Sequence, residues 1–133
     1  MSYLLWQYLE ESVERDASRP AVAWRDTTLS YGRLAALANG LAAALAEHGI
    51  GRDCRVGIYT PKSPRAVVGL LGAMRAGAAY VPVDPNAPAR RAAYILGDCR
   101  TAALVTTQRK VLELREVAGD LGALRLIVLT EDG

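Results

Sequence analysis

The sequence predicts an α/β fold: a doubly wound, mainly parallel sheet with helices on both faces, preceded by an N-terminal helix and a short hairpin. Apolar runs of strand length alternate with segments in which apolar residues recur every three or four positions, which is the period of a helix. These helical segments are about ten residues or longer, which is enough for crossovers between parallel strands. Such crossovers are right-handed, so helices should cover both faces of the sheet. The runs lie at residues 55–60, 79–83, 102–106 and 125–129.

The first thirty residues predict a helix followed by a hairpin. Residues 3–15 form an amphipathic pattern, for which Ser2 is the candidate cap. Pro20 ends this region, and two short strands at 21–24 and 28–31 are expected on either side of a polar turn. The apolar face of the helix would consist of Leu5, Trp6, Leu9 and Val13.

A second helix is expected between Ser30 and Gly49. Ser30 precedes the apolar pattern and can accept a hydrogen bond at the helix N-terminus. Gly49 stands where a left-handed C-cap residue belongs. Gly40 inside the helix costs about 1 kcal/mol relative to alanine, unless close packing requires the missing side chain. The apolar positions are Leu34, Leu37, Ala38, Leu41 and Leu45.

Strands and helices continue to alternate to the end of the chain. Ser63 and Pro64 mark the start of a third helix, and Gly77 marks its end. Pro82 should confine its strand to a sheet edge or lie at the strand's end. The later elements are a turn at 84–88, a helix at 90–96, the strand at 102–106, a helix at 108–118 capped by Thr107, and the strand at 125–129.

The composition is that of a folded domain in a reducing compartment. With 133 residues, 51% hydrophobic and 23% charged, the chain can bury a core and lies far from the composition of disordered proteins. Cys54 and Cys99 are too far apart for a C-x-x-C zinc or redox motif, and each is expected to be a buried small hydrophobic residue. The start of the chain has no signal-peptide pattern, so a cytoplasmic location is expected.

Charge and hydropathy argue against nucleic acid and membranes as partners. The net charge of +2 is too weak to favour either. No apolar run approaches the ~20 residues that span a bilayer. The one basic concentration is spread over two predicted helices and a loop, which is typical of a solvated surface. It consists of Arg90, Arg91, Arg100, Arg109 and Lys110.

No residue pattern indicates a catalytic, cofactor-binding or metal site. Gly49-Ile50-Gly51 begins like a dinucleotide fingerprint, but Cys54 stands where the third glycine belongs, and no G-K-S/T sequence indicates a P-loop. His48, the only histidine, has no ligand partner one turn away and lies at a helix end that favours a cation. No serine occurs in a G-x-S-x-G context.

Asp84 leaves two interpretations open. It follows a predicted strand, and open α/β sheets bind ligands beyond the carboxyl ends of their strands. Between Pro82 and Pro85, however, an aspartate is typically a turn residue that bonds the backbone. The neighbouring pair Glu10 and Glu11 is formally able to act as acid or base as well.

Two stretches carry a more specific pattern. They are L-S-Y-G-R-L at 29–34 and M-R-A-G-A-A-Y-V-P-V-D-P at 74–85. They resemble the first and second core motifs of the adenylate-forming superfamily, which includes the adenylation domains of nonribosomal peptide synthetases and the AMP-forming acyl-CoA ligases. Further matches at 55–58 and 88–96 follow in the family's order. The sequence A-Y-V-P-V-D-P at 79–85 resembles the amino acid-activating branch of this superfamily more closely.

The resemblance implies a two-step reaction of a complete enzyme. A carboxylic or amino acid reacts with ATP, in the presence of Mg, to give an acyl-adenylate and pyrophosphate, and the acyl group passes to the thiol of carrier-protein phosphopantetheine or of CoA. The family's phosphate-binding loop, substrate pocket and catalytic lysine lie beyond the matched motifs. Residues 1–133 are therefore expected to be the N-terminal part of a ligase's large N-terminal domain, cofactor-free and inactive alone, with the remainder of the ligase, in the same or a separate chain, as partner.

The matched residues are expected to have structural roles rather than catalytic ones. Ser30 would cap a helix that Tyr31 and Leu34 anchor to the sheet. Gly77 would end the next helix before a strand that finishes in a stiff turn. The whole set is Leu29, Ser30, Tyr31, Leu34, Gly77, Ala78, Tyr80, Val81, Pro82 and Asp84.

Two other functions remain as alternatives. A free-standing truncated homologue could act as a binding or regulatory module for a carrier protein or a full-length ligase. A self-sufficient sheet without a large exposed apolar patch would favour that hypothesis. An unrelated flavodoxin-like domain would share the alternation of strands and helices but not the long second motif.

Overall fold

The computed structural model describes residues 4–119 and 121–130, and within them strands and helices alternate as predicted. The elements are α1 (Leu5–Asp16), β1 (Pro20–Trp24), β2 (Thr27–Ser30), α2 (Tyr31–Glu47), β3 (Arg55–Tyr59), α3 (Pro64–Arg75), β4 (Ala79–Pro82), α4 (Ala89–Asp98), β5 (Ala103–Thr106), α5 (Gln108–Val117) and β6 (Leu126–Leu129).

The main sheet contains four strands in the order β4-β3-β5-β6, and all neighbours are parallel. At its centre, Gly57 of β3 lies between Val81 of β4 and Leu104 of β5. Leu104 in turn lies opposite Ile127 of β6. The predicted parallel sheet is confirmed, and Pro82 stands at the end of a strand that is also an edge of the sheet, where a missing N–H costs no ladder bond.

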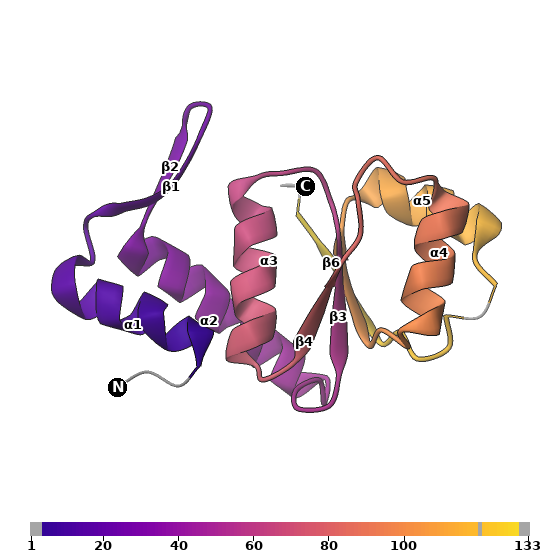
Figure 1. Cartoon of the computed structure of the whole chain (residues 1–133), viewed down its shortest axis with the longest axis horizontal. Helices are drawn as coiled ribbons and strands as arrows, with labels where there is room; N and C mark the ends of the chain where they lie inside the picture. The colour runs from indigo at the N-terminus through magenta and orange to yellow at the C-terminus, as the bar shows by residue number, and fades with distance from the viewer. Residues whose placement is uncertain (1–3, 120, 131–133) are drawn as a thin grey trace.

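Helices cover both faces of this sheet, as a doubly wound arrangement requires. Figure 1 shows the sheet almost edge-on, with α2 and α3 on one side and α4 and α5 on the other. The helices of each pair contact one another. Gly72 makes the α2–α3 contact close, because a Cβ at this position would lie 2.7 Å from a methyl carbon of Leu41.

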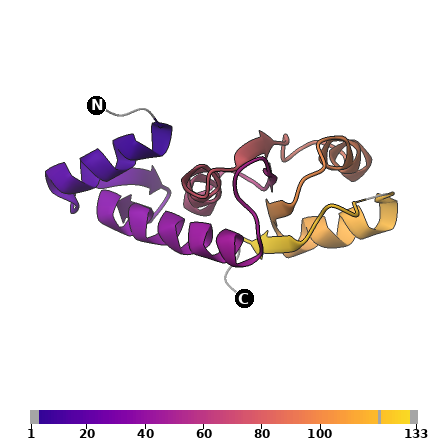
Figure 2. The ribbon, with the colours of Figure 1, turned by 90° about the horizontal axis from the view of Figure 1, so that it is seen from below.

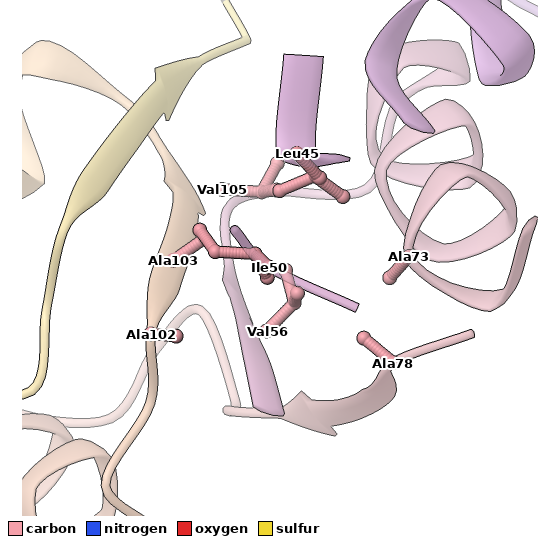
Figure 3. Packing of buried hydrophobic residues seen from close by; sticks show 8 residues of the cluster. All are labelled: Leu45, Ile50, Val56, Ala73, Ala78, Ala102, Ala103 and Val105. Atoms are coloured by element: carbon pink, nitrogen blue, oxygen red, sulfur yellow. The ribbon is translucent and has the colours of Figure 1, made fainter. Parts of the chain in front are cut away.

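A separate core fills each face of the sheet. Alternate residues of a strand point to opposite faces, so Val105 belongs to the α2–α3 core and Leu104 to the α4–α5 core. Figure 3 shows the first core, where α2, β3 and β5 bring Leu45, Val56 and Val105 together. The second core is built from Tyr59, Val83, Ala92, Ala93, Leu96, Leu104 and Leu114.

The N-terminal elements form a layer outside the main sheet. The antiparallel hairpin β1–β2 projects from the body of the molecule, and α1 packs against α2 and α3 (Figure 1). The guanidinium of Arg75 lies 4.2 Å from the centre of the Trp6 ring and donates to Asn39 at 3.2 Å, which joins all three helices. Leu5, predicted to lie on the packed face of α1, is instead 69% exposed.

The helix ends carry the caps that the sequence predicts. The side chains of Ser30, Ser63 and Thr107 each accept a hydrogen bond from the backbone N–H three residues later. Gly49 and Gly77 follow helices with φ angles of 70° and 88°, in the left-handed region. α1 begins at Leu5, and the candidate cap Ser2 lies outside the described residues.

Two expectations need correction. The α2 side chains in the sheet core are Leu45 and, at its margin, Leu41, so these residues rather than Tyr31 and Leu34 anchor α2 to the main sheet. Leu34 is buried nearer the hairpin end of the helix. Cys54 and Cys99 are free thiols, but both are only partly buried. Within the described ranges, no helix has the length and apolar character needed to cross a membrane.

Candidate functional site

The candidate site lies at the carboxyl end of the parallel sheet, where the second motif turns from β4 into α4. Val83 continues the ladder by donating to the Ile58 carbonyl at 2.9 Å, after which the chain turns at Asp84. A carboxylate oxygen of Asp84 accepts from the Asn86 N–H at 2.9 Å, and the Asp84 carbonyl accepts from the Ala87 N–H at 2.9 Å. The Asp84 side chain thus occupies the backbone-bonding position of a turn residue.

The side chain of Tyr59, at the end of β3, packs under this turn and is hydrogen-bonded to it. Tyr59 is the last residue of β3, its side chain is 1% exposed, and its hydroxyl donates to the Ala87 carbonyl at 2.8 Å. Burial, followed by the negative charges of Glu113 and Asp84, raises the pKa of Tyr59 above its usual 10.0. The neutral phenol is the form that donates this hydrogen bond, so the site favours the protonation state on which the turn depends.

Lys110 closes the same turn from the neighbouring helix. Its ammonium donates to the Pro85 carbonyl at 2.7 Å and lies 4.2 Å from the centre of the Tyr59 ring. The first contact is a charge-assisted hydrogen bond, and the second is a cation–π contact. Three elements, β3, α5 and the β4–α4 connection, are therefore fixed to one another at this corner.

Threonine hydroxyls hold the ends of the central strands together. The buried Thr106 hydroxyl donates to the Tyr59 carbonyl at 2.6 Å, which links β5 to β3. The hydroxyls of Thr60 and Thr130 lie 3.0 Å apart, and the Thr130 N–H donates to the Thr106 carbonyl at 2.9 Å. No buried side-chain N or O atom in the described part of the chain lacks a partner.

An open hollow of about 470 Å³ lies beside the turn. Tyr59 and Lys110 form its inner wall, and Arg109 and Glu113 stand at its outer rim. Arg109 and Glu113 pair across one helical turn at 3.1 Å, with the arginine side chain 89% exposed. The hollow is shaped by prolines and backbone carbonyls, and its arginine, lysine and glutamate are already engaged with one another or with the backbone.

The scaffold residues of the two motifs lie in different regions. Leu29 pairs with Val22 in the hairpin, Ser30 accepts from the Arg33 N–H at 3.1 Å, and Tyr31 donates its N–H to the Arg19 carbonyl at 2.9 Å. The second motif runs along β4. Ala78 is buried at its start, and Tyr80, Val81 and Pro82 pair with Val56, Gly57 and Ile58.

The described residues bring no catalytic constellation together. They contain no group of three or more histidine, cysteine, aspartate or glutamate side chains placed to hold a metal ion. The Nδ1 atom of His48 lies 2.9 Å from the Ala44 carbonyl one turn back in α2. The Gly49 carbonyl accepts from Arg125, which places this loop among backbone contacts at the opposite end of the sheet.

Sequence analysis did not identify the roles of Tyr59, Thr106 and Lys110. The residues in contact are separated by 25 to 47 positions, beyond the range of any periodic pattern. One local signal was present: Arg109 and Lys110 place two cations in the first turn of α5, which the helix dipole disfavours. Such a lysine needs a compensating acceptor, which the Pro85 carbonyl provides.

With this geometry in view, comparison with known proteins decides the family. The model of the protein family described as "AMP-binding enzyme" matches residues 9–133, which is nearly the whole chain. The chain belongs to the AMP-binding enzyme family. Surfactin synthase subunit 3 of Bacillus subtilis (strain 168) is 40% identical over 117 residues, or 88% of this chain.

Solved structures of other proteins have the same fold as this chain. The anthranilate CoA ligase AuaEII in complex with anthranoyl-AMP superposes on 96% of this chain with a TM-score of 0.89 and 26% identity. NpsA-ThdA, an artificially fused adenylation-PCP di-domain from Klebsiella oxytoca, has the same fold over 96% of the chain, with a TM-score of 0.78 and 23% identity.

The relatives are much longer than this chain. The matched region is 9% of the surfactin synthase subunit, 25% of the CoA ligase structure and 23% of the fused di-domain. In each of these three comparisons, the chain therefore corresponds to a part of a larger protein. The matched part consists of the motif-bearing sheet and helices described above.

Proposed function

We propose that this chain is the N-terminal scaffold segment of an AMP-forming ligase, which activates an amino or carboxylic acid as an acyl-adenylate and transfers it to a thiol. The observation that carries the proposal is the second motif at 74–85, which forms one continuous structural unit. Gly77 ends α3 with a left-handed φ, β4 forms the sheet edge, and the Asp84 turn is fixed by Tyr59 and Lys110.

The chemistry of the complete enzyme requires groups that this segment does not provide. ATP and Mg are substrate and cofactor of the proposed reaction, and Mg²⁺ is usually held by one or two carboxylates together with substrate phosphates and water. The sequence has no phosphate-binding glycine loop. As part of the proposal, we assign the binding of ATP and Mg to the remainder of the ligase and a scaffold role to this segment.

Among acid substrates, amino acids fit the comparisons best. The curated relatives at about 40% identity are surfactin, gramicidin and tyrocidine synthases, whereas the CoA ligase structure shares 26%. A carrier-protein thiol is then the proposed acceptor, in keeping with the adenylation-PCP fusion among the proteins of the same fold. CoA is the acceptor if the acyl-CoA branch applies.

The alternative of an independent binding module requires a sheet that covers its own apolar surface. In this chain, Ile127 and Leu129 of β6 are 42% and 45% exposed. Two neighbouring apolar side chains at a sheet edge are more typical of a surface that other residues cover. This exposure therefore favours the interpretation that the chain is a segment of a larger enzyme.

A chimera tests the proposed function directly. Residues 9–133 of this chain replace the matched segment of surfactin synthase subunit 3, and substrate-dependent ATP–pyrophosphate exchange is measured. If the segment is a scaffold, the chimera keeps the exchange activity and the substrate preference of the recipient, while the isolated chain gives no exchange above background.

A control variant shows how the chimera behaves when the segment does not fold, so that this case can be told apart from a folded but inactive chimera. Gly57→Val in the chimera places a Cβ about 2.5 Å from a Leu96 methyl carbon in the middle of the sheet and should abolish exchange by unfolding the segment. An inactive chimera whose circular dichroism and melting curve match those of the recipient would contradict the proposal, because the segment would then be folded but not interchangeable.

A further inference from the structure

A hollow of about 640 Å³ lies between α4 and the end of α5. Its lining includes Arg90, Tyr94 and Asp98, which stand four positions apart and therefore share one stripe of α4. Val117, the last residue of α5, lines it from the other helix. Figures 1 and 2 show α4 and α5 side by side at the end of the molecule that is farthest from α1 and the hairpin.

A second hollow continues the first one. Its volume is about 270 Å³, and it shares Gly97 and Arg100 with the first. From there it reaches Leu121, in the connection between α5 and β6. We call the two hollows together the α4–α5 groove. Because a helix rises about 1.5 Å per residue, the backbones of Arg90 and Arg100 are about 15 Å apart along it.

Three side chains of this groove have no polar partner within the described part of the chain. The guanidiniums of Arg90 and Arg100 form no ion pair or hydrogen bond with residues 4–119 and 121–130. Tyr94 is 70% exposed, and its hydroxyl makes no hydrogen bond with these residues either. Arginine and tyrosine are among the residue types that most often supply the binding energy of protein interfaces.

Arg100 occupies a backbone position that glycine takes at two other helix ends. Its φ angle is 51°, in the left-handed region, and it follows the C-cap of α4 as Gly49 follows that of α2 and Gly77 that of α3. At all three ends the next residue donates its N–H to the carbonyl five positions back, as Thr101 does to Leu96 at 3.2 Å. A side chain in this conformation has a cost that glycine avoids. Packing does not offset that cost, because Arg100 is exposed.

We propose that the α4–α5 groove binds an extended acidic peptide segment of a partner protein. Carboxylates of the segment pair with Arg90 and Arg100, whose planar donors match a carboxylate, and a side chain between them packs on the Tyr94 ring. An extended chain spans about 15 Å in about five residues, so the acidic residues stand four or five positions apart. This inference goes beyond the proposed function and does not depend on it.

Asp98 favours a peptide over a nucleic acid as the occupant. It lies between the two arginines along α4 and lines the same hollow. A nucleic acid carries a phosphate at every nucleotide, and a carboxylate within the groove repels these charges. A peptide presents backbone N–H groups, for which the Asp98 carboxylate is an acceptor. Val117 and Leu121 provide apolar contacts for its side chains.

Fluorescence anisotropy tests the proposal with the whole chain and two labelled octapeptides. The acidic probe is Ser-Glu-Ser-Leu-Pro-Ser-Glu-Ser, and the neutral probe has glutamine in place of both glutamates. We expect the acidic probe to bind about fivefold more tightly or better at low ionic strength, with a difference that shrinks as salt is added. Equal affinities, or no saturable binding of the acidic probe, would overturn the proposal.

Substitutions locate the contact. Arg90→Gln and Arg100→Gly should each weaken binding of the acidic probe by about fivefold or more, because each removes one charge-assisted pair. Arg91→Gln is the matched control, since Arg91 is the next residue of α4, is exposed, and lines neither hollow. It should change the dissociation constant by less than about twofold. Equal losses at positions 90, 91 and 100 would show that the groove is not the binding site.

Arg100→Gly also separates binding from a structural role. Glycine adopts the left-handed backbone of this position readily, so the melting temperature of the variant should not fall. If Arg100 served only to place a cation at the negative end of α4, the variant would melt at a lower temperature and bind the acidic probe unchanged. That result would overturn the proposal.

A single-stranded RNA octanucleotide provides the last comparison. RNA binding that is tighter than that of the acidic probe and is lost in Arg90→Gln would assign the groove to nucleic acid and overturn the peptide as occupant. The comparison of the acidic and neutral probes uses the unsubstituted chain, so the proposal stays falsifiable if a variant fails to fold.

Discussion

Lys110 illustrates how one side chain fixes the geometry of a family motif from outside that motif. Its ammonium contacts the Pro85 carbonyl and the Tyr59 ring, so the turn after β4 depends on a residue of α5. Lys110 is partly buried, and its ammonium donates to a backbone carbonyl. The next residue back, Arg109, is almost fully exposed and makes only a surface ion pair with Glu113.

This contrast gives a prediction for the pair. Lys110→Met should lower the free energy of unfolding by about 1–2 kcal/mol, through loss of one charge-assisted hydrogen bond and one cation–π contact. Arg109→Met should lower it by no more than about 0.5 kcal/mol, because exposed ion pairs contribute little. Urea denaturation of the two variants measures both values, and equal losses would contradict the role assigned to Lys110.

Tyr59 gives a prediction with a defined sign. Because its pKa is raised above 10.0 in the folded protein, the unfolded chain loses this proton first as the pH rises. The contribution of Tyr59 to stability is therefore complete below pH 10.0 and declines as the pH rises through the folded-state value.

Tyr59→Phe isolates this effect, because phenylalanine keeps the ring beneath Lys110 and removes only the hydroxyl that donates to Ala87. At neutral pH the variant should be about 1 kcal/mol less stable. This difference should shrink as the pH is raised above 10.0, whereas Tyr94→Phe controls for loss of an exposed tyrosine hydroxyl. A difference that stays constant or grows with pH would show that the sign is wrong.

At the level of elements, the glycines of α2 and α3 have opposite roles. Gly40 faces open space, since an added Cβ would meet nothing within 4 Å. The close-packing exception considered for this position in the sequence therefore does not apply. Gly72, by contrast, lies at the contact between the two helices, where an added Cβ would come within 2.7 to 2.9 Å of three Leu41 carbons.

Alanine should therefore have opposite effects at the two positions. Gly40→Ala is expected to raise the free energy of unfolding by about 0.5–1 kcal/mol, the difference in helix propensity. Gly72→Ala is expected to lower it by about 1–3 kcal/mol, because α2 and α3 must separate or Leu41 must leave its rotamer. Thermal denaturation compares the two variants, and a gain in stability at Gly72 would refute the close contact.

The elements themselves were predictable, because their signals are local. For every helix of the described chain, the predicted bounds lie within a few residues of the observed ones. The signals were the helical period of apolar residues, the serine and threonine caps, and the glycines at positions 49 and 77. Packing was less predictable. Leu5 follows the helical pattern of α1, but Trp6 makes the contact with Arg75 and leaves Leu5 in water.

The candidate site was predictable only in outline. The motif at 74–85 indicated a strand that ends in a stiff turn, and Asp84 could be weighed as a turn residue. Its supports, Tyr59 and Lys110, come from two other elements, and no spacing along the chain connects them to the turn. The cations in the first turn of α5 were the one signal, and they do not specify the acceptor.

On the scale of the whole molecule, one sheet separates two cores. The α2–α3 core contains Leu45 and the α4–α5 core contains Leu96, and both side chains are fully buried. Every strand with residues in one core also presents alternate residues to the other face. The two halves should therefore lose their structure together.

Leu96→Ala tests this coupling. The substitution should lower the free energy of unfolding by about 2–5 kcal/mol, the usual cost of a buried leucine. The two tryptophans, Trp6 and Trp24, both lie outside the α4–α5 half of the molecule: Trp6 packs on Arg75 of α3, and Trp24 lies in the hairpin. If the molecule unfolds as one unit, tryptophan fluorescence and far-ultraviolet circular dichroism shift to the same lower urea midpoint. A fluorescence midpoint that stays at its original value would indicate two independent halves.

The strand order β4-β3-β5-β6 has a further consequence, for synthesis on the ribosome. β3 emerges first, β4 joins it on one side, and every later strand adds on the other side. After β4 has joined, the sheet thus grows in a single direction as the chain leaves the exit tunnel, and each new strand pairs with a strand that has already been made. Pro82, which lacks an N–H, lies at the edge that is completed first, and β6 is the last strand of the described chain to be added.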